Sequence, residues 1–412
     1  MTPQIKQRIE QIRRGEVPEG YKKTKLGVVP NEWEDTLFSD LFTSTSDYTD
    51  DLNRYPLYSL TIEDGITAKT ERYERSHLVK KENAYKIVRP NDFAYNPMNV
   101  RFGAVARHKG KNEVSISGYY DIFTTKVTSD LEFMDSFLIS DNMITYYNKV
   151  SIGSLVEKQR VHFSQFIDFR LPLPSEAERK KIADILSKQE KLIALKEKLI
   201  EEKKRQKKAL MQQLLTGKKR LPGFSDEWRK IKLSAVLIEG NKVAVVDTSM
   251  YRKMTVKLAF KGLEFTKTDR EMADTRPFYV RKKNEIIIGK QNYFNGSVAL
   301  VTDEFDGCIC SNAIMSFGVK NANVKFILEY ISQVDFMKKR EMLANGTGQK
   351  ELSEKEFLNF EIKLPCIEEQ NHIGNIASTC DSEILLLQKN LDQEKQKKKS
   401  LMQLLLTGIV RV

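Results

Sequence analysis

The stretch LMQQLLTG at Leu210–Gly217 returns almost unchanged as LMQLLLTG at Leu401–Gly408. The two copies are 401 − 210 = 191 residues apart. At this offset, identical residues recur without a gap far back along the chain, at Phe166, Phe169, Leu173, Pro174, Glu178, Ile182, Ile185, Ser187, Ile193, Leu195, Lys207 and Lys208. A repeat of this length must be explained before any single motif.

The two tryptophans mark the other end of the repeat. PNEW ends at Trp33 and SDEW at Trp228, an offset of 228 − 33 = 195. The sequence therefore predicts a tandem duplication in which each copy is a variable segment followed by a matched helix. We divide it into an N-terminal helix and linker (1–25), a first variable domain (26–172), a central helix (173–217), a second variable domain (218–363) and a C-terminal helix (364–412).

Both matched segments have the pattern of long amphipathic helices. Ser175 with Glu178 is a capping-box pattern at the start of the first, and apolar residues then recur about every 3.5 positions. Each segment ends at Thr-Gly, where Gly217 or Gly408 suits the positive φ of a helix C-cap. The two apolar stripes need partners, and we expect them to pair with each other as an antiparallel coiled coil, with the variable domains related by a pseudo-twofold axis.

The bulk composition favours a polyanionic partner. There are 68 Lys+Arg against 56 Asp+Glu, a formal charge of +12, which suits nucleic acid, although a merely basic soluble protein remains the alternative. The four cysteines do not form a disulfide framework and fit a reducing compartment. No apolar run is long enough to cross a bilayer and the first residues lack a signal core, so we expect a cytoplasmic protein without a membrane partner.

The variable segments read as α+β domains with amide-rich and basic loops at matching places. Short strands are expected near 85–88, 93–95, 103–106 and 114–117, and near 278–280, 285–288, 297–301 and 307–310. A helical stretch follows each set, at 133–147 and 324–343. Arg and Lys suit guanine O6 and N7, whereas Asn and Gln suit adenine N6 and N7.

These loops supply the candidate DNA-binding residues. In the first domain they are Tyr95, Asn96, Asn99, Arg101, Arg107, Lys109, Lys111, Lys158 and Arg160. In the second they are Lys290, Gln291, Asn292, Tyr293, Asn295, Thr347, Gln349 and Lys350. For any one of these residues an ordinary surface loop is the alternative, and the matched placement in two domains is the stronger argument.

Taken together, the P-x-E-W starts, the LP-x₃-E segments, the charged helices and the two LMQ-x-LLTG endings resemble the specificity (S) subunit of type I restriction-modification systems. The resemblance covers essentially the whole chain, and its most specific parts are 171–223, 364–408 and the NGTGQKELS stretch at 345–353. One departure is that the loop 154–160 lacks the G-T-G-Q pattern of its counterpart. The first 25 residues fit the circular pseudosymmetry of the family, with a helix that packs near the C-terminal helix.

The resemblance implies a non-catalytic subunit with two target recognition domains, each of which reads half of a bipartite site in double-stranded DNA. The helices would set the spacer and dock two modification subunits, which use S-adenosylmethionine to methylate adenine N6. Restriction subunits would add ATP- and Mg²⁺-dependent translocation and cleavage. This chain itself would hold no cofactor and no metal.

Other functions fit the residues less well. YNPMN at 95–99 lacks the second proline and the aromatic residue of a methyltransferase motif, GTGQK at 346–350 fails the spacing of a phosphate-binding loop, and Glu361 with Lys363 has no second acidic partner of a nuclease. Cys308 and Cys310 lack a second pair at zinc spacing and are expected in a core. The remaining alternative is a coiled-coil scaffold that binds only proteins, which leaves the two similar α+β domains unexplained.

Overall fold

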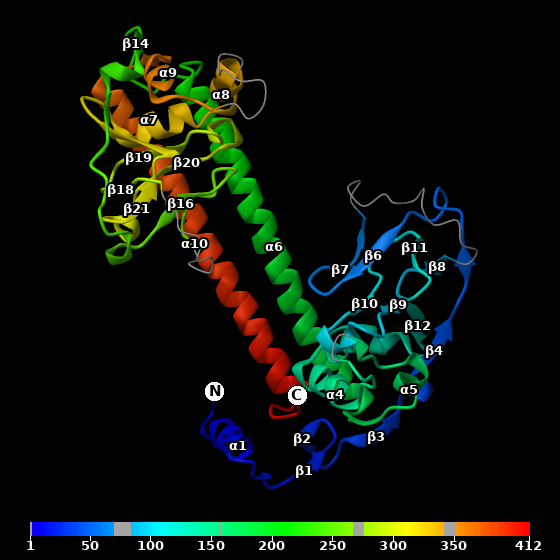
Figure 1. Cartoon of the computed structure of the whole chain (residues 1–412). Helices are drawn as coiled ribbons and strands as arrows, with labels where there is room; N and C mark the ends of the chain where they lie inside the picture. Colours follow the sequence, from blue (N-terminus) through cyan, green and yellow to red (C-terminus); the bar gives the residue numbers. More distant parts are fainter. Residues whose placement is uncertain (1, 70–83, 156–157, 267–275, 342–350) are drawn as a thin grey trace. The chain divides into compact units, whose positions relative to one another are not determined.

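The computed structural model describes residues 2–69, 84–155, 158–266, 276–341 and 351–412, and the chain divides into two compact units (Figure 1). Unit 1 comprises Met1–Lys196 together with Asn390–Val412, and unit 2 comprises Glu197–Lys389. Both boundaries fall inside long helices rather than at their ends. Each unit therefore contains part of both long helices. The domain limits expected from the sequence remain a prediction.

Unit 1 contains short strands and helices around the paired helix segments. Its helices are α1 (Pro3–Arg13), α2 (Phe38–Leu41), α3 (Leu131–Phe137), α4 (Asp141–Val150) and α5 (Phe163–Ile167), with the 3₁₀ turns η2 (Val100–Phe102) and η3 (Thr128–Asp130). Its strands are β1 (Tyr21–Thr24), β2 (Gly27–Pro30), β3 (Glu34–Leu37), β4 (Phe42–Thr45), β5 (Tyr48–Thr49), β6 (Tyr58–Thr61), β7 (Gly65–Ala68), β8 (Tyr85–Val88), β9 (Phe93–Tyr95), β10 (Val105–Arg107), β11 (Val114–Ser117), β12 (Asp121–Thr125) and β13 (Arg170–Leu173).

Unit 2 is likewise built from short helices, 3₁₀ turns and short strands. Its short helices are α7 (Val324–Ile331), α8 (Val334–Glu341) and α9 (Glu354–Leu358), with the 3₁₀ turns η5 (Leu233–Ala235), η6 (Thr248–Met250), η7 (Tyr293–Asn295) and η8 (Asp303–Phe305). Its strands are β14 (Arg229–Lys232), β15 (Leu237–Glu239), β16 (Met254–Val256), β17 (Leu263–Phe265), β18 (Phe278–Val280), β19 (Ile286–Gly289), β20 (Val298–Leu300), β21 (Ile309–Ser311), β22 (Ile314–Val319) and β23 (Glu361–Leu364).

The two units share one sheet topology. The four-stranded antiparallel sheet has the order β10-β9-β12-β4 in unit 1, and reading the sheet of unit 2 from its other edge gives β20-β19-β22-β15. The pairs β8–β11 and β18–β21, β6–β7 and β16–β17, and β3–β13 and β14–β23 correspond in the same way. The expected α+β class is confirmed, but each helical stretch is broken in two: α3 ends at Phe137 and α4 begins at Asp141, while α7 ends at Ile331 and α8 begins at Val334.

The long helices are α6 (Glu176–Leu215) and α10 (Ile367–Leu405). Within unit 1, Lys196 of α6 pairs with Glu394 at 3.2 Å and Glu190 pairs with Lys398 at 3.7 Å, so residue numbers rise along one helix as they fall along the other. Within unit 2, Lys203 with Glu383 and Lys207 with Asp381 follow the same rule. Both helix segments of each unit are therefore antiparallel, as expected.

Each unit has its own apolar core, and the helices complete it. In unit 1 an aromatic cluster around Phe38, Phe123 and Phe166 packs against Ile182 of α6 and Leu405 of α10. In unit 2, Met211 and Leu214 of α6 and Ile373 of α10 enter the core in the same way. Cys308 and Cys310 are free thiols buried in a second, smaller core, as predicted.

Each tryptophan packs on the glycine that ends a helix repeat. Gly217 (φ 69°) lies beside Trp228 in unit 2, whereas Gly408 (φ 68°) lies beside Trp33 in unit 1. The N-terminal segment adds to this contact in unit 1, because the Tyr21 hydroxyl donates to the carbonyl of Gly408 at 2.8 Å. Unit 1 thus uses the end of α10 where unit 2 uses the end of α6, which is the circular relation that the family resemblance implies.

These two glycines form a matched pair for mutation. Ala at Gly217 adds only the strain of a positive φ, about 1 kcal/mol, because its Cβ would meet Trp228 at an ordinary 3.8 Å. Ala at Gly408 adds the same strain, and its Cβ would lie 2.5 Å from two ring carbons of Pro30. We expect Gly408→Ala to lower the urea midpoint clearly more than Gly217→Ala, and equal midpoints would contradict the packing described here.

Candidate nucleic-acid interface

The first pair of predicted loops has the same backbone in both units. One follows β9 at 96–103 and the other begins on the last residue of β19, at 289–296. Each contains a 3₁₀ turn that ends on a glycine with positive φ, Gly103 or Gly296. Five backbone hydrogen bonds of one loop recur in the other at an offset of 289 − 96 = 193 residues. In unit 2 they are Gly289 N to Ser297 O, Asn292 N to Gly289 O, Asn295 N to Asn292 O, Gly296 N to Tyr293 O and Ser297 N to Asn292 O.

The residue directly after the second predicted loop bonds to the first loop in each unit. In unit 2 the Leu352 N–H donates to the carbonyl of Lys290 at 3.0 Å, and in unit 1 the Val161 N–H donates to the carbonyl of Pro97 at 3.0 Å. Both donors follow the second loop directly and both acceptors lie at the start of the first. The start of the first loop and the residue after the second loop therefore meet at an equivalent junction in each unit.

Several candidate residues of unit 1 are buried and hold the loop together. Tyr95 is fully buried and its hydroxyl donates to Val161 O at 2.9 Å, and burial raises its pKa so that it stays a donor. The Asn96 Oδ1 accepts the Met98 N–H at 3.1 Å and the Asn99 N–H at 3.2 Å. These side chains shape the loop, so we leave Tyr95 and Asn96 out of the proposed DNA contacts.

The other candidates of unit 1 differ in their exposure and in whether their side chains bind partners within the unit. Arg101 is 6% exposed and donates from Nη1 to Gln159, which links the two loops. Arg107 holds Asp135 with both ends of its guanidinium, at 3.0 and 2.7 Å, and Lys109 shares that carboxylate at 3.3 Å. Four candidates remain at the surface or partly so, with exposed side chains at Asn99, Lys111 and Lys158 and a half-buried one at Arg160.

Unit 2 shows the same division between buried and exposed candidates. Tyr293 is fully buried, its hydroxyl donates to Ile331 O at 2.7 Å, and burial raises its pKa. Asn295 donates to the half-buried Asn292 at 3.2 Å, while Gln291 is exposed and Lys290 is partly buried. The remaining candidates, Thr347, Gln349 and Lys350, lie outside the described residues.

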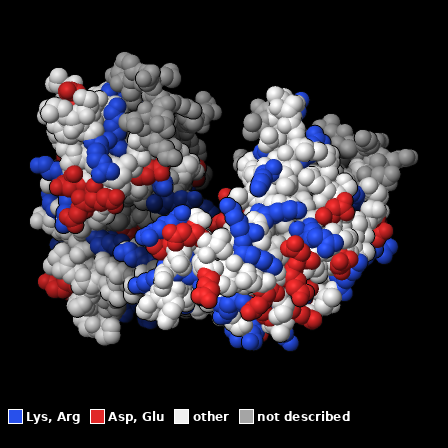
Figure 2. Space-filling view, turned by 90° about the horizontal axis from the view of Figure 1, so that it is seen from below, with Lys and Arg blue, Asp and Glu red and all other residues white. Residues whose placement is uncertain are grey.

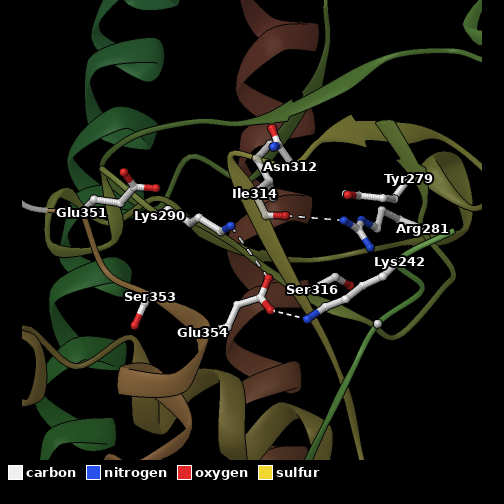
Figure 3. A pocket seen from close by; sticks show the side chains of 11 residues that line it. Lys242, Tyr279, Arg281, Lys290, Asn312, Ile314, Ser316, Glu351, Ser353 and Glu354 are labelled. Atoms are coloured by element: carbon white, nitrogen blue, oxygen red, sulfur yellow. Dashed lines mark hydrogen bonds and ion pairs between the residues drawn. The ribbon is translucent and has the colours of Figure 1, made fainter. Parts of the chain in front are cut away.

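A polar pocket beside the loop junction of unit 2 was not predicted from the sequence. It has a volume of about 590 Å³, and its walls include Lys242, Arg281, Asn312 and Glu354 together with Lys290 (Figure 3). These five residues come from five separate stretches of the chain, so no local motif marks them. Only the repeat offset, which places Lys290 opposite Pro97, indicates that the two loops differ here.

The charge of the chain is spread rather than gathered on the face that Figure 2 shows, where basic and acidic side chains alternate. Among the described residues, no group of three or more His, Cys, Asp or Glu side chains could hold a metal ion. None of the described helices is both long and apolar enough to cross a membrane. The arrangement offers hydrogen-bonding side chains at two equivalent loop junctions.

Three comparisons with known proteins each find specificity subunits of type I restriction systems among the proteins similar to this chain. Residues 227–395 match the model of the type I restriction modification DNA specificity domain. The chain is 25% identical to a Methanocaldococcus jannaschii protein provisionally named type I restriction enzyme MjaX specificity subunit (96% of this chain, 97% of that protein), and 23% identical to the MjaVIII specificity subunit of the same organism (96% of each). A solved type I S subunit from M. genitalium shares the fold at a TM-score of 0.53 and 14% identity, covering 90% of this chain and 96% of that one.

Proposed function

We propose that this chain, which belongs to the specificity subunits of type I restriction-modification systems, reads a bipartite DNA site with one half-site for each unit. The observation that carries the proposal is the backbone conformation that the loops of both units share. Five backbone hydrogen bonds and the loop junction are the same in both units, whereas the side chains on that frame differ. Two readers with one backbone and different side chains suit two half-sites of different sequence.

The exposed candidates divide into two roles under this proposal. Asn99, Gln291 and Asn295 offer amide groups suited to adenine edges, and they provide sequence selectivity. Lys111 and Lys158 carry charge at the surface and contact phosphates, which gives affinity that falls steeply with salt. Arg101 and Arg107 act indirectly, because each holds a loop through a partner of its own unit.

The long helices are the proposed docking surface for two modification subunits. Leucine side chains are exposed on α6 at Leu192 and Leu195 (37% and 65%) and on α10 at Leu385 and Leu386 (52% and 60%). A contiguous exposed apolar patch can mark a protein interface, and the leucines in each helix segment are neighbours. The methyl-donor and ATP chemistry would belong to the modification and restriction subunits, and this chain would be non-catalytic and act in the cytoplasm.

The test is adenine methylation mapping in cells that express the modification subunit with and without this chain. We expect a split motif that is methylated only when the chain is present, because the modification subunit alone has no reader. Recovery of the assembled complex by affinity purification is the control. An assembled complex that methylates no motif would favour the alternative, a scaffold that binds only proteins.

A further inference from the structure

Unit 1 carries an exposed aromatic ring within the first of its two predicted loops. Phe102 is 53% exposed and lies in η2, the 3₁₀ turn between β9 and β10. A single exposed apolar side chain is common on protein surfaces. What Phe102 can contact must therefore be argued from how the ring is held, from its neighbours and from its chemistry.

The ring of Phe102 is held in place by its own unit. The guanidinium carbon of Arg101 lies 5.1 Å from the centroid of the ring, and the Arg101 Nη1 donates to Gln159 beside the second loop. Asn148 of α4 donates to the Arg101 carbonyl at 2.8 Å, and the Phe102 N–H donates to the Asn99 carbonyl at 2.9 Å. A ring fixed in this way loses little entropy when it binds a partner.

Phe102 lies beside an amide that we propose to read an adenine. In a 3₁₀ turn, side chains three residues apart are eclipsed, which places Phe102 on the same side of the turn as Asn99. Unit 2 shows this proximity directly. The residues 193 positions on are Asn292 and Asn295, and the Asn295 side chain donates to the Asn292 side chain at 3.2 Å.

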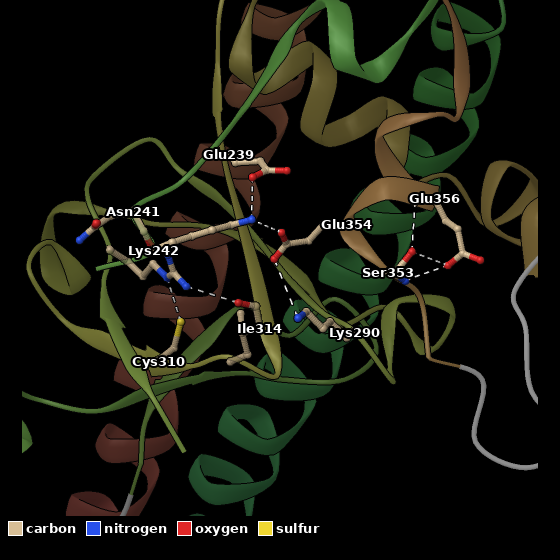
Figure 4. A network of polar contacts seen from close by, with 10 residues as sticks. Glu239, Asn241, Lys242, Lys290, Cys310, Ile314, Ser353, Glu354 and Glu356 are labelled. Carbon is tan, nitrogen blue, oxygen red and sulfur yellow. Dashed lines mark hydrogen bonds and ion pairs between the residues drawn. The ribbon is translucent and has the colours of Figure 1, made fainter. Parts of the chain in front are cut away.

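The cations of the first loop are engaged within their own units, and this leaves other side chains for an external partner. In unit 2 the Lys290 Nζ pairs with one Glu354 oxygen at 3.9 Å, while Lys242 pairs with the other at 2.6 Å (Figure 4). Arg101 of unit 1 is engaged by Gln159. The exposed side chains of the first loop are Asn99 and Phe102 in unit 1, and Gln291 and Asn295 in unit 2.

The chemistry of the ring limits what it can contact on DNA. Phenylalanine has no donor for a phosphate oxygen and no polar atom for the hydrogen-bonding groups of a base edge. The apolar group that the major groove presents is the 5-methyl group of thymine, and phenylalanine is one of the side chains that contact it. An amide beside an apolar ring therefore matches an adenine beside a thymine methyl group.

We propose that Phe102 is a specificity-determining residue that contacts the 5-methyl group of a thymine in the half-site read by unit 1. This thymine lies in the same base pair as the adenine that Asn99 contacts, or in an adjacent pair. The proposal rests on the function proposed above and names a base contact that one of its two readers makes.

The test is binding of the assembled complex to duplexes of its parent site in which each thymine is replaced in turn by deoxyuridine. Deoxyuridine differs from thymidine only by the missing 5-methyl group. At one thymine of one half-site the parent should bind about fourfold more weakly after replacement, the worth of one buried methyl group. Phe102→Ala should bind the two duplexes equally at that position. Asn99→Ala should relax the base preference at the same or an adjacent pair.

A second variant and a control separate base contact from a structural role. Phe102→Asn places the residue type of unit 2 at this position and should shift the base preference there toward adenine. A purely structural ring would not produce this shift. Val127→Ala is the matched control, because Val127 is another exposed apolar residue of unit 1 (43%) and lies outside both loops. Its binding should depend on the methyl group as that of the parent does.

The possible results are distinguishable. Equal loss of binding on deoxyuridine replacement in the parent and in Phe102→Ala would overturn the thymine contact. Weaker binding of Phe102→Ala to all duplexes, together with reduced DNA bending, would instead make the ring a wedge between base pairs. Failure to recover Phe102→Ala with the modification subunits would assign the ring to a protein contact. In each case a split motif methylated by the parent leaves the proposed function intact.

Discussion

Insertion of seven residues into each long helix is expected to lengthen the unread spacer of the DNA site by about three base pairs and to leave both half-sites unchanged. The insertions belong between Lys196 and Glu197 of α6 and between Lys389 and Asn390 of α10, where the two units divide. Seven helical residues add about 10 Å, and each base pair rises about 3.4 Å. Seven residues also preserve the apolar repeat of the paired helices.

Methylation mapping measures the spacer directly. The matched control is the same insertion in α6 alone, which shifts the register of ion pairs such as Lys196 with Glu394 and should abolish methylation. A double insertion that methylates the parent spacer would rule out the helices as the element that sets it. A double insertion that changes either half-site would show that the helices also shape the readers.

Arg220→Ala is expected to destabilise unit 2 by about 3 kcal/mol, because it leaves a buried carboxylate without its cation. The Arg220 guanidinium donates from Nε and Nη2 to the two oxygens of Glu369, both at 2.8 Å, and Glu369 is 1% exposed. The indole of Trp228 adds a third donor at 3.1 Å. These bonds connect the segment after α6 to the start of α10.

Urea unfolding followed by tryptophan fluorescence measures this effect in one unit. The chain has two tryptophans, so Trp33→Phe leaves Trp228, beside Arg220, as the reporter for unit 2. The urea midpoint of Arg220→Lys should lie between those of the parent and Arg220→Ala, since lysine keeps the charge but not the bidentate contact with Glu369. Lys230→Ala, which removes an exposed pair with Glu361, should leave the midpoint unchanged. A stable Arg220→Ala variant would mean that water or Trp228 satisfies Glu369.

The ion pair in unit 1 that corresponds to Arg220 with Glu369 could not be predicted from local sequence patterns. Arg411 donates to both oxygens of Glu178, at 2.5 and 3.0 Å, and 220 + 191 = 411 places it on Arg220. The repeat thus contained the signal three residues beyond Gly408. The Ser175–Glu178 spacing predicts a capping box, and the Glu178 N–H does donate to the Ser175 hydroxyl at 3.3 Å, but the Glu178 carboxylate pairs with Arg411. Local patterns cannot reveal a partner 233 residues away.

The candidate site shows a second limit. The sequence predicted the strands around both loops, and the loops themselves, from apolar alternation and turn residues. The pattern does not show which way each side chain points, so it marks Tyr95 and Tyr293 as candidate contacts although both are buried donors. The polar pocket of unit 2 leaves no local signal, because Lys242 and Glu354 are 112 residues apart and meet only in the folded unit.

Unit 1 is built from two separate parts of the chain, and this has a consequence during synthesis. The ribosome delivers all of unit 2 before it makes Asn390–Val412, which unit 1 requires. Until then the core that contains Ile182 lacks Leu405 and Leu406, and Glu178 lacks Arg411. Unit 2 can therefore fold on the emerging chain, whereas unit 1, although it is begun first, is completed last.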